Sequence, residues 1–191
     1  WDRYSFIGVR SRATLTSRAG SAVWVGDVPS GLRTDGDPLE VLADALAQLQ
    51  TAPVGGLPPL TSGFVGSIGW DAIAYWEPTL VPTAPIEVDV PDVALCLVED
   101  LVVVDHHDGV VWLIANAING DGSNERVEEA YANSCARLDA MAAKLASPVA
   151  TGAAGLGSAP APEVRPRTTQ EDYEASVEVA KERIRDGEAF Q

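Results

Sequence analysis

The chain has 191 residues, 46% of them hydrophobic, which is enough to bury the core of one domain and part of another. Its 28 acidic and 13 basic residues give a formal net charge of -15, which repels nucleic-acid phosphates and anionic lipid headgroups. No apolar run reaches the roughly 18 to 20 residues of a membrane span, and the first residues do not form a signal peptide. We therefore expect a cytoplasmic protein that binds neither nucleic acid nor membranes.

The opening of the chain is rich in β-forming residues. Short β-prone runs cover residues 4–10 and 12–16, and a third run at 22–25 follows the turn-like sequence Ala19-Gly20-Ser21. This spacing predicts a small antiparallel meander.

A helix is predicted next. Asp37 suits the N-cap, Pro38 suits the first helical position, and Glu40 completes a capping-box arrangement. Leucines at three- and four-residue spacing predict one buried stripe, formed by Leu39, Leu42, Leu46 and Leu49.

Gly63, Gly66 and Gly69 recur at a spacing of three residues. A phosphate-binding loop needs a following helix or a Gly-Lys-Ser/Thr sequence, and neither is present. Glycines in a strand instead allow another backbone to approach closely, so we expect close sheet packing at this segment.

Three further strands are predicted at residues 94–98, 101–104 and 110–117, with 105–109 as a hairpin tip between the last two. His106 and His107 lie in that tip, and neighbouring histidines on a turn rarely converge on one metal ion, so a solvated turn is favoured. Cys96 and Cys135 lack metal-ligand spacing and are expected to be buried free thiols.

A long helix is predicted after residue 122, with Ser123 as its cap and Glu125 in its first turn. The residues expected on its buried side are Val127, Tyr131, Ser134, Leu138, Met141 and Leu145.

The composition then changes to Pro, Ala and Gly, which predicts a flexible linker over 147–167. A third helix is expected from about Thr168 or Thr169, with Gly187 as its C-cap. Its apolar face, formed by Tyr173, Val177, Ala180 and Ile184, has no complete core in this chain. Strands come first, with helices between and after them, so the fold class expected is α+β, a largely antiparallel sheet with flanking helices.

The sequence contains no GxSxG, no HExxH, and no Cys/His pair at a recognisable spacing. We therefore assign no catalytic residue and no metal ligand within this chain.

Four collinear segments resemble the large subunits of anthranilate synthase, a family of chorismate-using enzymes. Residues 3–8, RYSFIG, resemble an element of that family, and residues 63–77 are similar to its glycine-rich segment. The hairpin at 101–116 and the pattern from Tyr173 to Gln191 are also similar. One departure is Gly69-Trp70-Asp71, where the family usually has Gly-Tyr-Asp, and the basic pair common after it is replaced by Ala72-Ile73-Ala74.

The resemblance implies a front segment of the chorismate-utilising fold, which is built of packed β-sheets covered by helices. Residues 1–146 would form an N-terminal regulatory domain, 147–167 a flexible linker, and 168–191 the start of the chorismate-binding catalytic domain. The full-length protein would be a lyase of tryptophan biosynthesis that forms anthranilate and pyruvate from chorismate. It would form a hetero-oligomer with a glutamine amidotransferase subunit that supplies ammonia. Its cofactor would be Mg2+. The magnesium-binding glutamates and substrate-binding cations would lie beyond Gln191.

The resemblance also implies an allosteric site for L-tryptophan, the feedback inhibitor, to which Tyr4, Ser5 and Phe6 contribute. An aromatic–serine–aromatic strand can supply one wall of an indole slot and a hydrogen-bonding group. From the residues alone, the favoured interpretation is that Tyr4 and Phe6 are core residues that share one face of a strand.

Two other functions stay open. Aminodeoxychorismate synthase component I, of the folate pathway, has the same kind of front segment. A non-catalytic amino-acid-binding module would have no catalytic domain at all.

Overall fold

The computed structural model describes residues 3–77, 79–80, 85–86, 88–119, 123–148, 152, 157 and 160–190. The chain divides into two compact units, Trp1–Val149 and Ala150–Gln191, which are described separately here. Positions 149–151, 153–156 and 158–159 of the predicted linker, and Gln191 of the family pattern, lie outside the described residues. The predicted domain boundaries stay a prediction.

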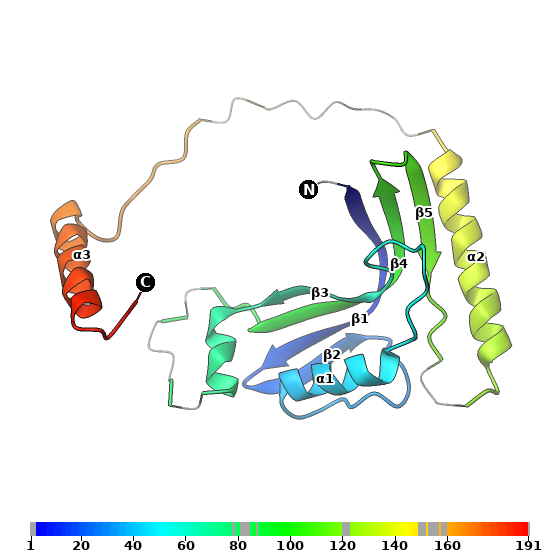
Figure 1. Cartoon of the computed structure of the whole chain (residues 1–191), viewed down its shortest axis with the longest axis horizontal. Coiled ribbons are helices and arrows are strands. Elements are labelled where there is room, and N and C mark those ends of the chain that lie inside the picture. The colour runs from blue at the N-terminus through cyan, green and yellow to red at the C-terminus, as the bar shows by residue number, and fades with distance from the viewer. Residues whose placement is uncertain are drawn as a thin grey trace. The chain divides into compact units, whose positions relative to one another are not determined.

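The first unit is built on an antiparallel sheet of five strands (Figure 1). The strands are β1 (Tyr4–Arg18), β2 (Ser21–Gly26), β3 (Gly63–Ile68), β4 (Val93–Asp105) and β5 (Val110–Ala115). Their order is β2-β1-β4-β3, and β5 also pairs with β4. Along one edge of β4, β3 pairs with residues 93–98 and β5 with residues 100–105. The sheet and its helices confirm the predicted α+β class.

Two of the strands are longer than predicted. β1 continues from Tyr4 to Arg18, where two short runs were expected, and β4 likewise joins the runs at 94–98 and 101–104. The pairing between β1 and β4 shifts register three times between Gly8 and Ala13. Such bulges let a strand bend without ending. The prediction of separate strands was wrong because charged residues at the bulges look like strand breaks in the sequence.

Helix α1 (Pro38–Leu49) begins as predicted. Asp37 Oδ1 accepts hydrogen bonds from the backbone N–H groups of Leu39 at 2.8 Å and Glu40 at 3.1 Å. The predicted leucine stripe was wrong in part, because Leu46 is 49% exposed and the buried residues are Pro38, Val41 and Ala45. Val41 packs with Leu15 of β1 and Ala22 of β2, so one face of the helix is turned to the sheet.

Gly66 confirms the expected close approach of two strands. A Cβ atom at this position would lie 1.9 Å from the carbonyl oxygen of Ala94 on β4. A side chain therefore cannot be accommodated there without moving the β3–β4 pair.

Helix α2 (Val127–Ala146) packs against β5 and begins later than predicted. Ser123 does not cap it; its Oγ accepts a hydrogen bond from Glu125 N–H at 3.4 Å in the preceding turn. Of the predicted stripe, Ser134 and Met141 are buried, and Leu138 is half-buried. Val127, Tyr131 and Leu145 are exposed in this chain. The cysteines were expected to be buried, and both are only half-buried.

The second unit contains helix α3 (Gln170–Arg185). Thr169 caps its start, and its Oγ1 accepts a hydrogen bond from Asp172 N–H at 3.2 Å. At its end Gly187 adopts φ 78°, with hydrogen bonds from Gly187 N–H to Ile184 O and from Glu188 N–H to Arg183 O. This pair of bonds is the Schellman motif, and it confirms Gly187 as the stop signal. None of the helix's described residues is buried.

Candidate functional site

The three residues singled out by the sequence lie at the start of β1. Tyr4 pairs with Asp105, Ser5 with Val104 and Phe6 with Val103 on β4. The opposite edge of β1 pairs with β2 only over residues 13–18. Over residues 4–10 that edge meets no strand in the described part of the chain, so its backbone hydrogen-bonding groups are open to a further strand or a ligand.

Tyr4 and Phe6 share one face of the sheet. Tyr4 is half-buried and packs on the core cluster of Val98, Leu101 and Val103. Its ring centroid lies 6.1 Å from that of Phe6, which is 39% exposed. Tyr4 thus serves the core, while Phe6 leaves part of its ring available to another molecule.

Ser5 lies on the opposite face, because side chains alternate along a strand. It is exposed, and its Oγ is hydrogen-bonded to His106 Nε2 at 2.8 Å. The three side chains therefore do not converge in one slot. A ligand that contacts both Ser5 and Phe6 must lie over the open edge of β1.

The turn between β4 and β5 is tied to the start of β1 by Arg3. Its Nη2 atom lies 2.7 Å from Asp105 Oδ2 and 2.8 Å from Asp108 Oδ2. The hydrogen bonds from Arg3, helped by the backbone N–H groups of Asp108 and His107, lower the pKa of Asp105 to about 2. This ion pair holds the hairpin tip next to Ser5.

The hairpin tip forms as the sequence predicts, with Asp105 as the last residue of β4 and the turn at residues 106–109. His107 Nδ1 lies 2.7 Å from Asp108 Oδ1, and His106 faces Ser5. Within the described ranges, no group of three or more His, Cys, Asp or Glu side chains could hold a metal ion. The Ser5–His106 contact was missed from sequence because the residues are 101 positions apart.

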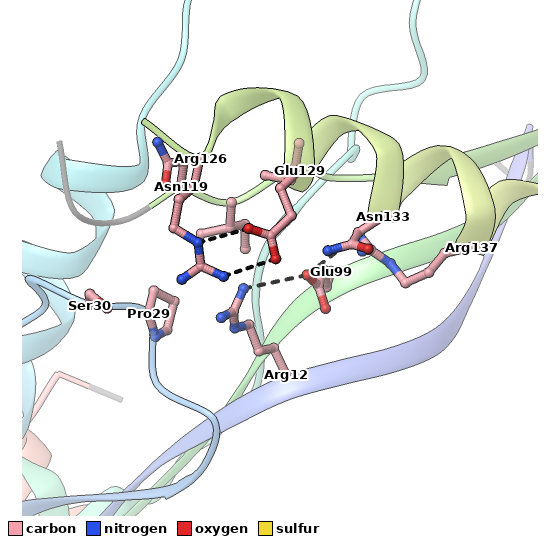
Figure 2. A pocket seen from close by; sticks show the side chains of 12 residues that line it. Arg12, Pro29, Ser30, Glu99, Asn119, Arg126, Glu129, Asn133 and Arg137 are labelled. Atoms are coloured by element: carbon pink, nitrogen blue, oxygen red, sulfur yellow. Dashed lines mark hydrogen bonds and ion pairs between the residues drawn. The ribbon is translucent and has the colours of Figure 1, made fainter. Parts of the chain in front are cut away.

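A second feature is a charged pocket between the bulged part of the sheet and the first turns of α2, lined among others by Arg12, Glu99, Arg126, Glu129 and Arg137. Figure 2 shows these side chains, which line the pocket. Glu99 is 3% exposed, and three guanidinium groups surround it. The distances are 3.2 Å from Arg10 Nε, 3.7 Å from Arg12 Nη1 and 3.4 Å from Arg137 Nη2.

The arginines of the charged pocket already have carboxylate partners. Arg12 pairs with Asp27 at 3.0 Å, Arg126 with Glu129 at 3.0 Å and Arg137 with Asp100 at 3.0 Å. Arg137 Nη2 also donates to the carbonyl of Asn116 at 2.7 Å. Positive and negative charges are thus matched within the pocket. We interpret the cluster as the structural link that holds α2 on the bend of the sheet.

None of the described helices combines the length and the apolar character that a membrane span requires.

Comparisons with known proteins agree with the fold and extend over the whole chain. The sequence model of the chorismate binding enzyme family matches residues 2–191. The chain is 44% identical to "Anthranilate synthase component 1" of Arthrobacter globiformis and 42% identical to that of Mycolicibacterium smegmatis. Both alignments cover 100% of this chain, which spans 36% of each relative's length.

A solved structure has the same fold. The crystal structure of anthranilate synthase component I from Streptococcus pneumoniae superposes with a TM-score of 0.68 at 22% identity. The match covers 97% of this chain and 39% of that chain. The family match over nearly all residues, joined to this shared fold, leads to one conclusion: the chain belongs to the chorismate binding enzyme family.

Proposed function

We propose that this chain is the front portion of the large subunit of an anthranilate synthase, a cytoplasmic lyase of tryptophan biosynthesis. The observation that carries the proposal is the alignment of the whole chain with relatives named anthranilate synthase component 1, at 44% and 42% identity. Because the chain spans 36% of their length, the activity is a property of the full-length protein. That protein converts chorismate and ammonia to anthranilate and pyruvate.

The proposal includes a second subunit and a metal. A glutamine amidotransferase subunit releases the ammonia from glutamine, in keeping with the word "component" in the relatives' name. Magnesium would assist the chemistry at the chorismate site. The described residues offer no cluster suited to a metal, so no ligand is assigned here and no step is derived through the ion.

The role of this portion is feedback control by L-tryptophan through Tyr4, Ser5 and Phe6. The open edge of β1 gives the effector a place to lie, with its indole against the exposed part of Phe6. The Ser5 hydroxyl and the open backbone groups of the strand can hydrogen-bond the effector's carboxylate. Tyr4 supports Phe6 from the core. Inhibition then requires that tryptophan favour one of two arrangements of the full-length protein, by about 1 to 3 kcal/mol.

The test is product analysis with the purified full-length protein, given chorismate, magnesium and an ammonium salt. The proposal predicts fluorescent anthranilate and an equal amount of pyruvate without a second enzyme. A protein that forms aminodeoxychorismate and no pyruvate would belong to the folate-pathway alternative. Failure to consume chorismate, with tryptophan still bound, would favour a non-catalytic amino-acid-binding module.

A further inference from the structure

Two tryptophans stand out on the surface of the first unit. Trp70 is the first residue of the short 3-10 helix η1 (Trp70–Tyr75), which follows β3 in the chain (Figure 1), and Trp76 comes directly after the last residue of η1. Trp70 is 86% exposed and Trp76 is 60% exposed. Tryptophan side chains are strongly buried on average, so two exposed ones on a single short element require an explanation.

The geometry of the 3-10 helix places both on one face. This helix has three residues per turn, so side chains at positions i and i+3 lie above one another. Its hydrogen bonding extends to Trp76, whose N–H donates to the carbonyl of Ile73 at 3.1 Å. Trp70, Ile73 and Trp76 therefore form one continuous surface, which we call the tryptophan ridge.

The opposite face of η1 is fixed to the sheet. Ala72 is fully buried, and the Tyr75 hydroxyl donates a hydrogen bond to Asp92 Oδ2 at 2.8 Å. Gly69 N–H donates to the carbonyl of Asp92 at 2.6 Å. Because these contacts hold the helix in place, the ridge is pre-organised, and a partner would not have to order the backbone on binding.

The sequence that contains the ridge is acidic. The chain has no Lys or Arg between Arg33 and Arg126. One exposed carboxylate, Asp71, lies within η1, and two more, Glu77 and Asp89, follow it in the chain. A complementary surface must therefore combine apolar pockets for the indoles with a rim of Lys and Arg, because charge complementarity sets partner choice and association rate.

We propose that the tryptophan ridge is the docking surface for a second protein subunit, whose cleft is apolar at its centre and basic at its rim. The inference rests on the proposed function, in which the partner is the subunit that supplies ammonia. Exposed tryptophans are the side chains most enriched among residues that dominate binding energy at interfaces. Basic groups on the partner would meet the carboxylates of the ridge, so binding weakens as the salt concentration rises.

The experiment uses the full-length large subunit and the purified glutamine amidotransferase subunit. Trp70→Ala and Trp76→Ala are compared with Tyr131→Ala, which removes an aromatic ring that is 67% exposed on α2. The affinity of the two subunits and the rates with glutamine and with ammonium salt are measured. We expect each ridge variant to raise the Kd by at least about tenfold, the loss typical of a central interface residue. The rate with ammonium salt should stay unchanged, and Tyr131→Ala should bind normally.

The solvent accessibility of the two indoles shows whether the partner subunit or the remainder of the same polypeptide covers the ridge. In hydroxyl-radical footprinting, Trp70 and Trp76 should be modified in the free large subunit and protected when the partner is added. Protection in the free large subunit would mean that the remainder of the same polypeptide covers the ridge, which overturns the proposal. An unchanged Kd in the Trp70→Ala/Trp76→Ala double variant would also overturn it. Failure of the proposed function can be told apart from failure of the docking proposal. If the proposed function is wrong, the wild-type protein forms no anthranilate with ammonium salt.

Discussion

The guanidinium group of Arg137 on α2 lies against the buried carboxylate of Asp100 on β4, with Nε 3.0 Å from one carboxylate oxygen and 3.1 Å from the other. The side chains are 18% and 4% exposed, respectively. Removal of the cation would leave a buried carboxylate without its ion-pair partner. We therefore predict that Arg137→Ala lowers the free energy of unfolding of the full-length protein by about 3 kcal/mol, measured by urea denaturation.

Lys181 provides the control for this prediction. It pairs with Glu178 on the surface of α3, and these side chains are 51% and 67% exposed. Exposed pairs of this kind contribute little, so Lys181→Ala should change the free energy of unfolding by less than about 1 kcal/mol. Equal effects of the two substitutions would contradict the assignment of Arg137 as the link between α2 and the sheet.

The ion pair between Arg3 and Asp105 makes stability depend on pH. The pKa of Asp105 falls from 3.8 to about 2 in the folded protein, mainly through its hydrogen bond with Arg3. A carboxyl group whose pKa is lowered by folding stabilises the protein fully when the pH is above the pKa of that group in the unfolded state. This stabilisation is lost as the pH falls from the unfolded-state pKa to the folded-state pKa. The difference in urea midpoint between wild type and Asp105→Asn should therefore shrink between about pH 5 and pH 2. A constant difference across this window would show that Asp105 is not held by Arg3.

Gly66 offers a test of the packing between β3 and β4. Because a Cβ atom at this position would lie 1.9 Å from Ala94 O, Gly66→Ala must displace one of the two backbones. We predict a loss of about 2 kcal/mol or more in the free energy of unfolding, in the range of overpacked cores. Gly8→Ala on β1 is the control, since its added Cβ would meet no atom within 4 Å. A stable Gly66→Ala variant with unchanged amide protection in β3 would contradict the close approach.

Features that depend on neighbouring residues in the chain could be predicted from the sequence. The Asp37 cap, the hairpin tip at 105–109 and the Gly187 stop all follow from local backbone chemistry, and the structure has each of them. Features that depend on distant residues could not. Glu99 and Asp100 look like the end of a strand in sequence, and they can stay buried within β4 only because arginines from β1 and α2 surround them.

In the candidate site, too, the features that depend on distant residues could not be predicted from the sequence. Tyr4, Ser5 and Phe6 were selected by family resemblance, and no local physical signal would separate them from an ordinary strand. Two features beside these residues depend on the pairing of β1 with β4. The other edge of β1 is open there, and His106 lies beside Ser5. Of the tryptophan ridge, only Trp70 stood out in the sequence, as a departure from the family's usual Gly-Tyr-Asp, because exposure cannot be read from an apolar residue type.

The most direct measurement of the regulatory role is a tryptophan titration of anthranilate formation by the full-length enzyme, for wild type, Ser5→Phe and the control Ser147→Phe. Ser147 is an exposed serine outside β1, at the end of α2. The account predicts that tryptophan inhibits the wild type and the control, and that Ser5→Phe keeps its activity without tryptophan but loses inhibition. Calorimetry should show the matching loss of tryptophan binding. Inhibition of Ser5→Phe at the wild-type tryptophan concentration would contradict the placement of the effector on the opening strand.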